Sequence, residues 1–507
     1  MTARTITSAD GLDARLVVEV AAGQPVAIAP GLAGDVQQRC DQARAALRDG
    51  RPVYGVNTGM GAMAGVRLTE AEQRAHQRNL MLARASGGPP WLDPADARAL
   101  IAVRLRTFLS GDSGVSAALC QRLVDVLDAG ILPAVPRTGV GCAGEIVPLA
   151  HAFGPLVGIG RVLDFAGGTR PAGDALREHG LAEFELGPRE GLALLAGVPG
   201  ATALGLRRGA EAAALVGLME TAAALSITAI RASRDPYGAA CARGDDVLGQ
   251  VLGRLREAVG EEAAPRALQA PVSFRVVGQV LAHVHRSRAA LASAAGRALD
   301  GVTDSPAFLD GRFTGTAAFH GIDLAAHCDQ LTAALAHAAE VSAARCHRLL
   351  DPRVTGLPAQ LTPHPGPETG LVTVHKRAAG ETHALRRLAT ATPVGLIETS
   401  GGQEDVQSFG WEAAENLRTA LRHAHVVTAC ELLMAHQAHA LSDHSAPSGC
   451  RPALDWLATV LVRGDAVVPR GHAPGPHGPE PRVLTDRPFG EDIERLLDAP
   501  TRPAFGT

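Results

Sequence analysis

Long alanine- and leucine-rich stretches constrain the fold of this 507-residue chain more than any other feature. Four of them have the three- and four-residue apolar spacing of helices: 203–232, 276–299, 322–350 and 411–441. In the third stretch Leu324, Cys328 and Leu331 form a seam at spacings of four and three. Because alanine is small, such helices can approach one another closely. We therefore predict a mainly α fold with a long central helical bundle.

The first 200 residues mix shorter helical patterns with glycine-rich loops. Residue patterns typical of helices occur at 35–49, 69–85, 94–109 and 116–128, each bounded by Gly, Pro or Asp. Short apolar runs at 16–20 and 26–28 favour strands or an irregular lead-in, and a hairpin is predicted near 164–170. We predict three segments: a loop-bearing N-terminal domain at 1–200, a central helical bundle at 201–463, and a Pro/Gly-rich loop with a C-terminal segment at 464–507.

Composition excludes several classes of protein. The net charge of −4 gives no electrostatic basis for binding nucleic acid or an anionic membrane. The eight cysteines include no Cys-x-x-Cys pair and indicate free thiols in a reducing compartment. The histidines show no metal-ligand spacing supported by carboxylates. We expect a cytoplasmic protein with no metal site, no membrane segment and no nucleic-acid partner.

A glycine-rich loop carries the most specific motif. Gly141 and Gly144 flank Cys142 and Ala143, so the backbone can turn tightly there. An apolar run with Pro148 near its start follows and predicts a helix. We therefore expect the triplet Cys142-Ala143-Gly144 to lie on a loop that leads into a helix N-terminus.

The stretch 138–151 resembles the signature of the aromatic amino acid ammonia-lyase family, which includes histidine, phenylalanine and tyrosine ammonia-lyases and the related aminomutases. Further matching stretches extend the resemblance over about residues 40–500: 54–59, 189–195, 271–275, 319–321, 351–353 and 403–405. The resemblance implies a histidine/phenylalanine ammonia-lyase-like fold. It also implies a homotetramer whose pockets are each built from several subunits.

The family that the sequence resembles makes a cofactor from this triplet. The triplet of this chain differs from the family's at the residue that the cofactor needs. In the family an Ala-Ser-Gly triplet cyclises to the electrophile 4-methylidene-imidazol-5-one (MIO). The methylidene carbon comes from the serine Cβ after its hydroxyl is lost. Ala143 stands at the serine position and has no hydroxyl to lose. We therefore expect a protein without MIO and with no other cofactor.

Several site residues match the family. The resemblance makes Tyr54 the catalytic base that removes a substrate proton, and it places Glu404 near the substrate amine. Arg275 corresponds to the arginine that binds the substrate carboxylate, and Gln269 begins the same motif. Taken alone, a loop tyrosine, a surface arginine and a helix-terminal glutamate would more often be structural.

Other positions depart from the family pattern. Val272 replaces a tyrosine needed for MIO formation, and Ala196 replaces an asparagine beside the electrophile. Arg84 stands where a His or Leu selects the substrate ring, and an Asn is lost just before Phe319, at Ala318. These changes surround one pocket while the candidate base and the carboxylate anchor remain. The pattern favours a pocket that has been re-purposed.

Three functions fit these residues. The favoured one is an MIO-independent lyase- or cyclase-type enzyme acting on a small carboxylate or amino-acid-derived substrate, with carrier-protein presentation left open. In it Tyr54 moves a proton while Arg275 and Arg84 bind polar groups. The alternatives are a lyase or aminomutase inactivated by a serine-to-alanine change at 143, and a non-catalytic ligand-binding homologue. For Cys142, an inert side chain is favoured over a nucleophile.

Overall fold

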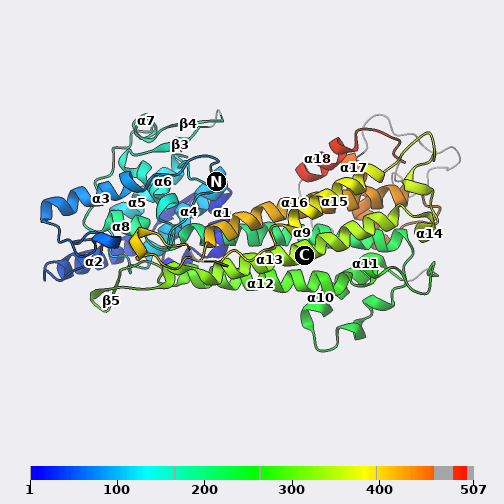
Figure 1. Cartoon of the computed structure of the whole chain (residues 1–507), viewed down its shortest axis with the longest axis horizontal. Coiled ribbons are helices and arrows are strands. Elements are labelled where there is room, and N and C mark those ends of the chain that lie inside the picture. The colour runs from blue at the N-terminus through cyan, green and yellow to red at the C-terminus, as the bar shows by residue number, and fades with distance from the viewer. Residues whose placement is uncertain (1, 165–166, 262–263, 396, 462–482, 500–507) are drawn as a thin grey trace. The chain divides into compact units, whose positions relative to one another are not determined.

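The structure, a computed structural model, describes residues 2–164, 167–261, 264–395, 397–461 and 483–499 (Figure 1). Helices dominate these residues, which confirms the predicted mainly α fold. The strands of this part of the chain form only three two-stranded pairs: parallel β1 (Arg4–Ile6) with β2 (Val26–Ile28), antiparallel β3 (Arg161–Leu163) with β4 (Thr169–Pro171), and antiparallel β5 (Ala307–Leu309) with β6 (Arg312–Thr314).

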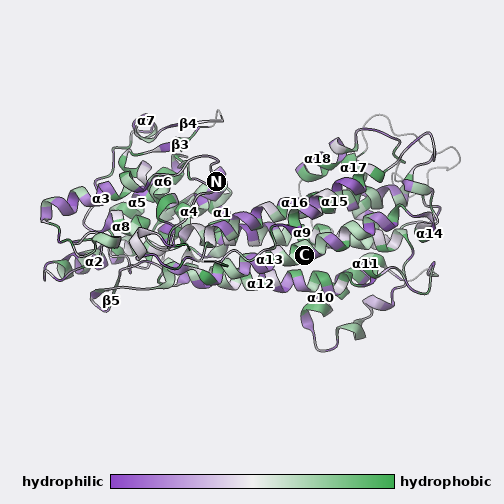
Figure 2. Ribbon diagram, viewed as in Figure 1, coloured by the Kyte–Doolittle hydropathy of each residue, from purple (hydrophilic) through white to green (hydrophobic). Residues whose placement is uncertain are grey.

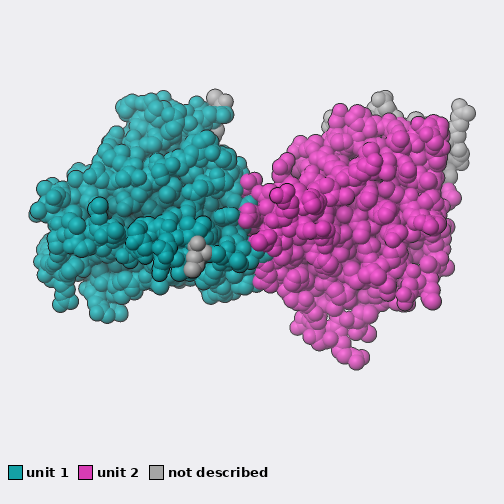
Figure 3. All heavy atoms as spheres, viewed as in Figure 1, with its two compact units in different colours: residues 1–210, 290–329, 391–415 teal, residues 211–289, 330–390, 416–507 magenta. Residues whose placement is uncertain are grey.

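The chain divides into two compact units, coloured separately in Figure 3. Unit 1 comprises 1–210, 290–329 and 391–415, and unit 2 comprises 211–289, 330–390 and 416–507. Four unit boundaries fall inside long helices: α9 (Pro199–Ala229), α12 (Val277–Asp300), α13 (Ile322–Leu349) and α16 (Gly410–Ala440). The division into three consecutive segments follows chain order instead and stays a prediction.

Unit 1 contains the shorter N-terminal helices and most of the long loops. These helices are α1 (Ala14–Ala21), α2 (Pro30–Leu47), α3 (Glu70–Arg84), α4 (Pro94–Leu109), α5 (Ala117–Asp128), α6 (Ile146–Phe153), α7 (Ala172–Glu178) and α8 (Glu190–Leu195). Helix α4 forms the centre of the core, because apolar side chains on nearly all of its sides are buried. A helix that is apolar all round is stable only when other elements surround it.

Unit 2 is built around the remaining parts of the long helices. Its other helices are α10 (Asp246–Val259), α11 (Val272–Arg275), α14 (Pro352–Thr355), α15 (Val372–Arg386), α17 (Arg451–Leu461) and α18 (Phe489–Asp498). Figure 2 shows hydrophobic and hydrophilic residues along the same helices, and α10, α17 and α18 each bury apolar residues at helical spacing, such as Leu248, Val251, Leu252 and Leu255 of α10.

The sequence located most helices because their end signals are local. Helix α3 begins with a capping box between Thr69 and Glu72, and the Ser116 side chain caps α5. The four long helices are confirmed, with ends that differ from the predicted ones by a few residues. The hairpin near 164–170 is confirmed as β3–β4, and the 26–28 strand as β2.

One local prediction was wrong. Residues 16–20 are not a strand but part of helix α1, which Asp13 caps by accepting from the Leu16 N–H at 2.8 Å. Leu16, Val17 and Val20 are all buried. Val20 follows Val17 by three positions and Leu16 by four, which places the three side chains on one face of a helix. Residues 464–482 of the predicted Pro/Gly-rich loop lie outside the described residues.

A close approach in unit 1 fixes the start of α9. A Cβ added at Gly200 would lie only 2.1 Å from Trp411 Cζ3, so only glycine lets Trp411 of α16 pack against this turn. The stretch Glu190–Ala229, which includes α9, is long and apolar enough to span a membrane, but 83% of its most apolar window is buried inside the structure.

Candidate functional site

The triplet lies on a loop of unit 1 directly before α6, as predicted. Gly144 has a φ of +80°, a conformation that residues with a Cβ rarely adopt. A Cβ at Gly144 would lie 3.4 Å from the Gly197 carbonyl oxygen and 3.8 Å from that of Phe319. The triplet therefore lies beside the backbone of two other predicted site segments, those at 196 and 319.

Glu145 fixes the end of this loop. Its buried carboxylate accepts the backbone N–H groups of Gly200 and Ala201, both at 2.6 Å. These are first-turn N–H groups of α9, which have no partner within the helix and carry the positive end of its dipole. Burial nevertheless raises the pKa of Glu145 to about 7, because desolvation of the charged form outweighs the two N–H donors.

Arg137 fixes the beginning of the loop. Its guanidinium Nη1 donates to both carboxylate oxygens of Glu415, at 3.1 and 3.0 Å. Its carbonyl oxygen accepts from Trp411 Nε1 at 3.0 Å. The side chains of Arg137 and Glu415 are both buried, so this contact is shielded from water and is stronger than one at the surface. The loop is thus held at both ends.

Glu404 contacts the middle of the triplet. Its Oε2 accepts the backbone N–H of Ala143 at 3.1 Å and the Thr399 hydroxyl at 2.7 Å. Thr399 and Glu404 also pair through their backbones, so the carboxylate is held on a narrow loop turn. Glu404 thus lies next to the triplet, and its place near a substrate amine stays a prediction.

Tyr54 lies in a turn that its neighbours hold in place. Asn57 accepts the Val53 N–H and donates to the Arg51 carbonyl oxygen, each at 2.7 Å. The Tyr54 oxygen accepts the Gly61 N–H at 2.8 Å, and 39% of the residue is exposed. The side chain is therefore oriented and remains open to a small molecule.

Arg84 lies close enough to both Tyr54 and Glu404 to interact with them electrostatically. It is the last residue of α3 and is half-buried. Burial lowers the pKa of its guanidinium, and the charges of Tyr54 and Glu404 oppose this change. Tyr54, Arg84, Glu404 and Ala143 thus come from four separate parts of the sequence and lie near one another in unit 1.

The predicted carboxylate anchor belongs to the other unit. Gln269, Val272 and Arg275 all lie in unit 2, where Val272 begins α11 and Arg275 ends it. Val272 is 58% exposed. The Nε atom of Arg275 is buried and has no hydrogen-bond partner among the described residues. The structure thus groups the predicted site residues into two sets, one in each unit.

The structure also shows the surroundings of two residues with small side chains, Cys142 and Ala196. Burial raises the pKa of the Cys142 thiol to about 11, so the thiol stays protonated near neutral pH. This supports an inert side chain. The Ala196 carbonyl oxygen accepts from Nη2 of Arg104, a buried arginine that interacts electrostatically with Glu145.

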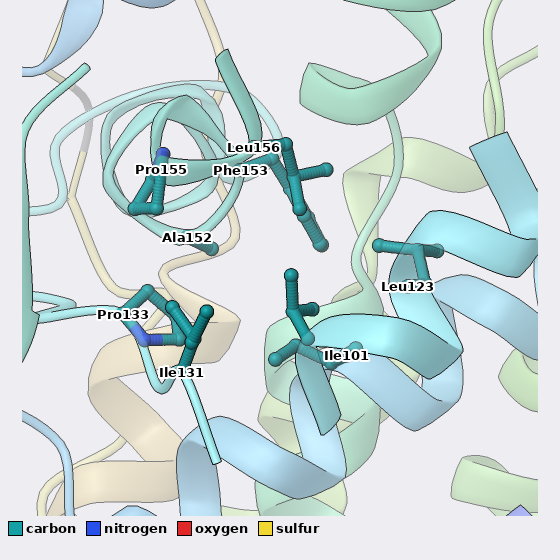
Figure 4. A pocket seen from close by; sticks show the side chains of 9 residues that line it. Ile101, Leu123, Ile131, Pro133, Ala152, Phe153, Pro155 and Leu156 are labelled. Carbon is teal, nitrogen blue, oxygen red and sulfur yellow. The ribbon is translucent and has the colours of Figure 1, made fainter. Parts of the chain in front are cut away.

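The residues present do not fit MIO. Ala143 carries a methyl group without the oxygen that cyclisation must expel, and its backbone N–H is a donor to Glu404. Within the described residues, no group of three or more His, Cys, Asp or Glu side chains could hold a metal ion. A small cavity in unit 1 is lined only by apolar residues such as Ile101, Leu123 and Leu156, and it offers no polar group to a substrate (Figure 4).

The fold and the triplet loop together define an ammonia-lyase-like protein, and comparison with known proteins specifies the family. Residues 12–459 match the family model for aromatic amino acid lyases, so the chain belongs to the aromatic amino acid lyase family. It is 33% identical to the histidine ammonia-lyase of Streptomyces avermitilis over 438 residues, 84% of each chain. It is 33% identical to that of Geobacillus thermodenitrificans over 486 residues, covering 93% of this chain and 92% of the relative.

A solved structure supports the same fold. The tyrosine aminomutase of Streptomyces globisporus superposes with a TM-score of 0.87 at 26% identity. The match covers 97% of this chain and 96% of the aminomutase. The predicted ammonia-lyase-like fold is therefore confirmed.

Sequence reasoning missed the residues that hold the loop. Arg137, Thr399 and Trp411 were not predicted, because their partners are distant in the sequence: Arg137 and Glu415 are 278 positions apart. Glu145 was visible only as the acidic residue after the triplet. An acidic residue directly before a predicted apolar helix was the one sequence signal that could have indicated an anchoring role.

We predict a specific pH dependence for Glu145→Gln. The pKa of Glu145 is about 7 in the fold and near the ordinary glutamate value of 4.5 in the unfolded chain, so the folded protein binds a proton between these pH values. This group's contribution to stability therefore falls as pH rises from about 4.5 to 7.

Glutamine cannot titrate, so the melting-temperature difference between wild type and Glu145→Gln should shift against the wild type over that range. Calorimetry at several pH values measures it. A difference that stays constant over this range, or that moves in favour of the wild type, would show that the carboxylate is already ionised in the folded protein.

Proposed function

We propose that this member of the aromatic amino acid lyase family is an MIO-independent enzyme. In it Tyr54 transfers a proton to or from a small substrate, Arg275 binds the substrate carboxylate, and Arg84 binds a second polar or anionic group. The observation that carries the proposal is that Arg84 interacts electrostatically with both Tyr54 and Glu404, and that Glu404 in turn accepts the Ala143 N–H of the triplet loop.

The surroundings of Tyr54 support the role of proton acceptor. The phenol oxygen already accepts one N–H, from Gly61, and the Arg84 guanidinium interacts with it electrostatically. The Gly61 N–H holds the phenol oxygen in one direction, and the Arg84 guanidinium is a cation close to it. A general base must also reach its substrate, and the exposure of Tyr54 allows this.

The loss of MIO restricts the reaction. Ammonia is a poor leaving group without an electrophile, so ordinary deamination of an aromatic amino acid is not the proposed reaction. Elimination of a better leaving group, conjugate addition or a cyclisation needs only a base and bound anions. We propose one of these reactions on a carboxylate or amino-acid-derived substrate, either free or presented by a carrier protein.

The absence of MIO is tested by the mass of the intact protein. Cyclisation of the triplet removes two water molecules, so the purified protein should have the full mass of its linear sequence. A mass short by two waters would contradict MIO independence. Peptide mapping across 138–151 would place any such loss on the triplet.

Three variants test the roles of the residues once a substrate is identified. Tyr54→Phe removes the proton acceptor with little change of shape, so kcat should fall by about 10²- to 10⁴-fold with nearly unchanged binding. Arg275→Lys keeps the charge but loses the two-pronged donor, so binding should weaken about 10- to 100-fold. Ala143→Ser should not create ammonia-lyase activity, because Val272 and Ala196 lack the family's supporting groups.

The same variants separate the alternatives. A ligand-binding homologue would tolerate Tyr54→Phe and lose only binding in Arg275→Lys. An inactivated lyase would begin to deaminate an aromatic amino acid after Ala143→Ser alone. Full activity of Tyr54→Phe would refute the proposed mechanism.

We also propose a cytoplasmic homotetramer in which subunits share each pocket. Such an assembly would let Arg275 of one subunit complete the site around Tyr54 of another. Exposed apolar side chains beside both sets of residues support it: Met63, Val66, Leu82, Val394, Ile397 and Val406 in unit 1, and Leu268 and Val272 in unit 2. Large apolar side chains exposed beside site residues are typical of surfaces that another subunit covers.

Sedimentation velocity measures the assembly directly. The wild-type protein should sediment as a tetramer, and Val272→Asp should weaken it because a charge would be buried at the subunit contact. A stable, folded monomer of the wild type would contradict the proposal.

A further inference from the structure

Helix α11 is a single turn whose carbonyl groups need partners from elsewhere. A four-residue helix is so short that most of its carbonyl oxygens accept no hydrogen bond from an N–H of the same helix. Two buried side chains of unit 2 supply donors. The Tyr237 hydroxyl donates to the Phe274 carbonyl oxygen at 2.7 Å, and Nη1 of Arg345 donates to that of Ser273 at 3.1 Å. Both carbonyl groups directly precede Arg275.

The two donors are themselves held in place. Arg345 pairs with Glu431 through Nε at 2.6 Å and Nη2 at 2.7 Å, and both side chains are buried. The remaining nitrogen, Nη1, is thereby aimed at the Ser273 carbonyl. Glu431 also accepts the Ser226 hydroxyl at 2.7 Å and the Ser342 hydroxyl at 2.5 Å. This network therefore fixes the direction of the Arg345 side chain.

Tyr237 is equally constrained. It ends the short helix η4 (Asp235–Tyr237), none of its surface is exposed, and its carbonyl oxygen accepts from Arg256 Nη1 at 2.8 Å. It is one of two tyrosines in the chain. A buried phenol needs a hydrogen-bond partner, and the Phe274 carbonyl provides it.

A buried ion pair is a weak source of stability, because removing both charges from water costs about as much as their attraction returns. The Arg345–Glu431 pair is better explained by the geometry that it imposes. The Nη1 contact of Arg345 ends on the Ser273 carbonyl, two residues before Arg275, whose Nε is one of several buried arginine Nε atoms without a hydrogen-bond partner among the described residues. A desolvated N–H donor without a partner is costly unless an anion accepts from it.

We propose that Tyr237 and Arg345 are positioning residues for Arg275. They hold the carbonyl groups of the α11 turn so that the guanidinium is preorganised for a substrate carboxylate. This inference rests on the proposed role of Arg275 as the carboxylate anchor. Neither Tyr237 nor Arg345 touches the substrate; each acts through the backbone of the turn.

Binding of benzoate, a minimal aromatic carboxylate, tests the inference on the full chain by calorimetry. Tyr237→Phe removes only the hydroxyl and should weaken benzoate binding by about 10-fold, the effect of one lost hydrogen bond at a preorganised site. Thr382→Val is the matched control, because it removes a buried hydroxyl of unit 2 that bonds only within α15. It should leave benzoate affinity within about twofold.

A double-mutant cycle shows whether Tyr237 acts through Arg275. In an Arg275→Ala background, Tyr237→Phe should have no further effect on benzoate affinity, because the group that it positions is gone. An equal loss of affinity in both backgrounds would overturn the positioning role while leaving the anchor intact. Unchanged affinity in Arg275→Ala alone, or no benzoate binding by the wild type, would refute the anchor and with it the proposed function.

Hydrogen exchange reports on the turn without a ligand. Tyr237→Phe should accelerate exchange in a peptide covering 271–277, whereas Thr382→Val should not. Arg345→Lys keeps the charge opposite Glu431 but lacks the planar fork that reaches both Glu431 and the Ser273 carbonyl, so it should resemble Tyr237→Phe in both measurements. Exchange in 271–277 that is unchanged in both variants would overturn the inference.

Discussion

The candidate site depends on the hydrogen bonds that the Glu145 carboxylate accepts. Glu145 follows the triplet directly and accepts two N–H groups from the first turn of α9. Without these bonds, the buried carboxylate and the first turn of the helix would each lack hydrogen-bond partners. Because Glu145 cannot move without breaking both bonds, the end of the triplet loop has one position relative to α9. The position of Ala143 beside Glu404 follows from it.

The second anchor explains why the middle of the loop consists of small residues. Arg137 joins the other end to α16 through Glu415 and Trp411, and Trp411 packs where Gly200 has no side chain. Between Arg137 and Glu145 the loop must leave room for Glu404 to reach the Ala143 N–H. The two anchors therefore supply rigidity through buried polar contacts rather than through apolar packing of the loop itself.

Sequence predicted the helices and the triplet loop but not the contacts that hold the site together. Helix ends are set by near neighbours, as the Thr69–Glu72 capping box shows. The apolar run at 16–20 was misassigned because a short apolar segment has no clear period. Tyr54, Arg84 and Glu404 were found through the family resemblance. Thr399 was not, because nothing in its local sequence indicates that its hydroxyl meets Glu404.

The charges of the proposed pocket indicate what kind of substrate fits it. In the proposed assembly Arg84 of one subunit and Arg275 of another would contribute two positive charges, and Oε2 of Glu404 accepts the Ala143 N–H and the Thr399 hydroxyl. Burial lowers the pKa of Arg84, so a substrate anion beside it would recover part of the desolvation cost. A zwitterionic amino acid brings one carboxylate for two arginines. Under the proposed function, a substrate with a second anionic group would supply one anion for each arginine.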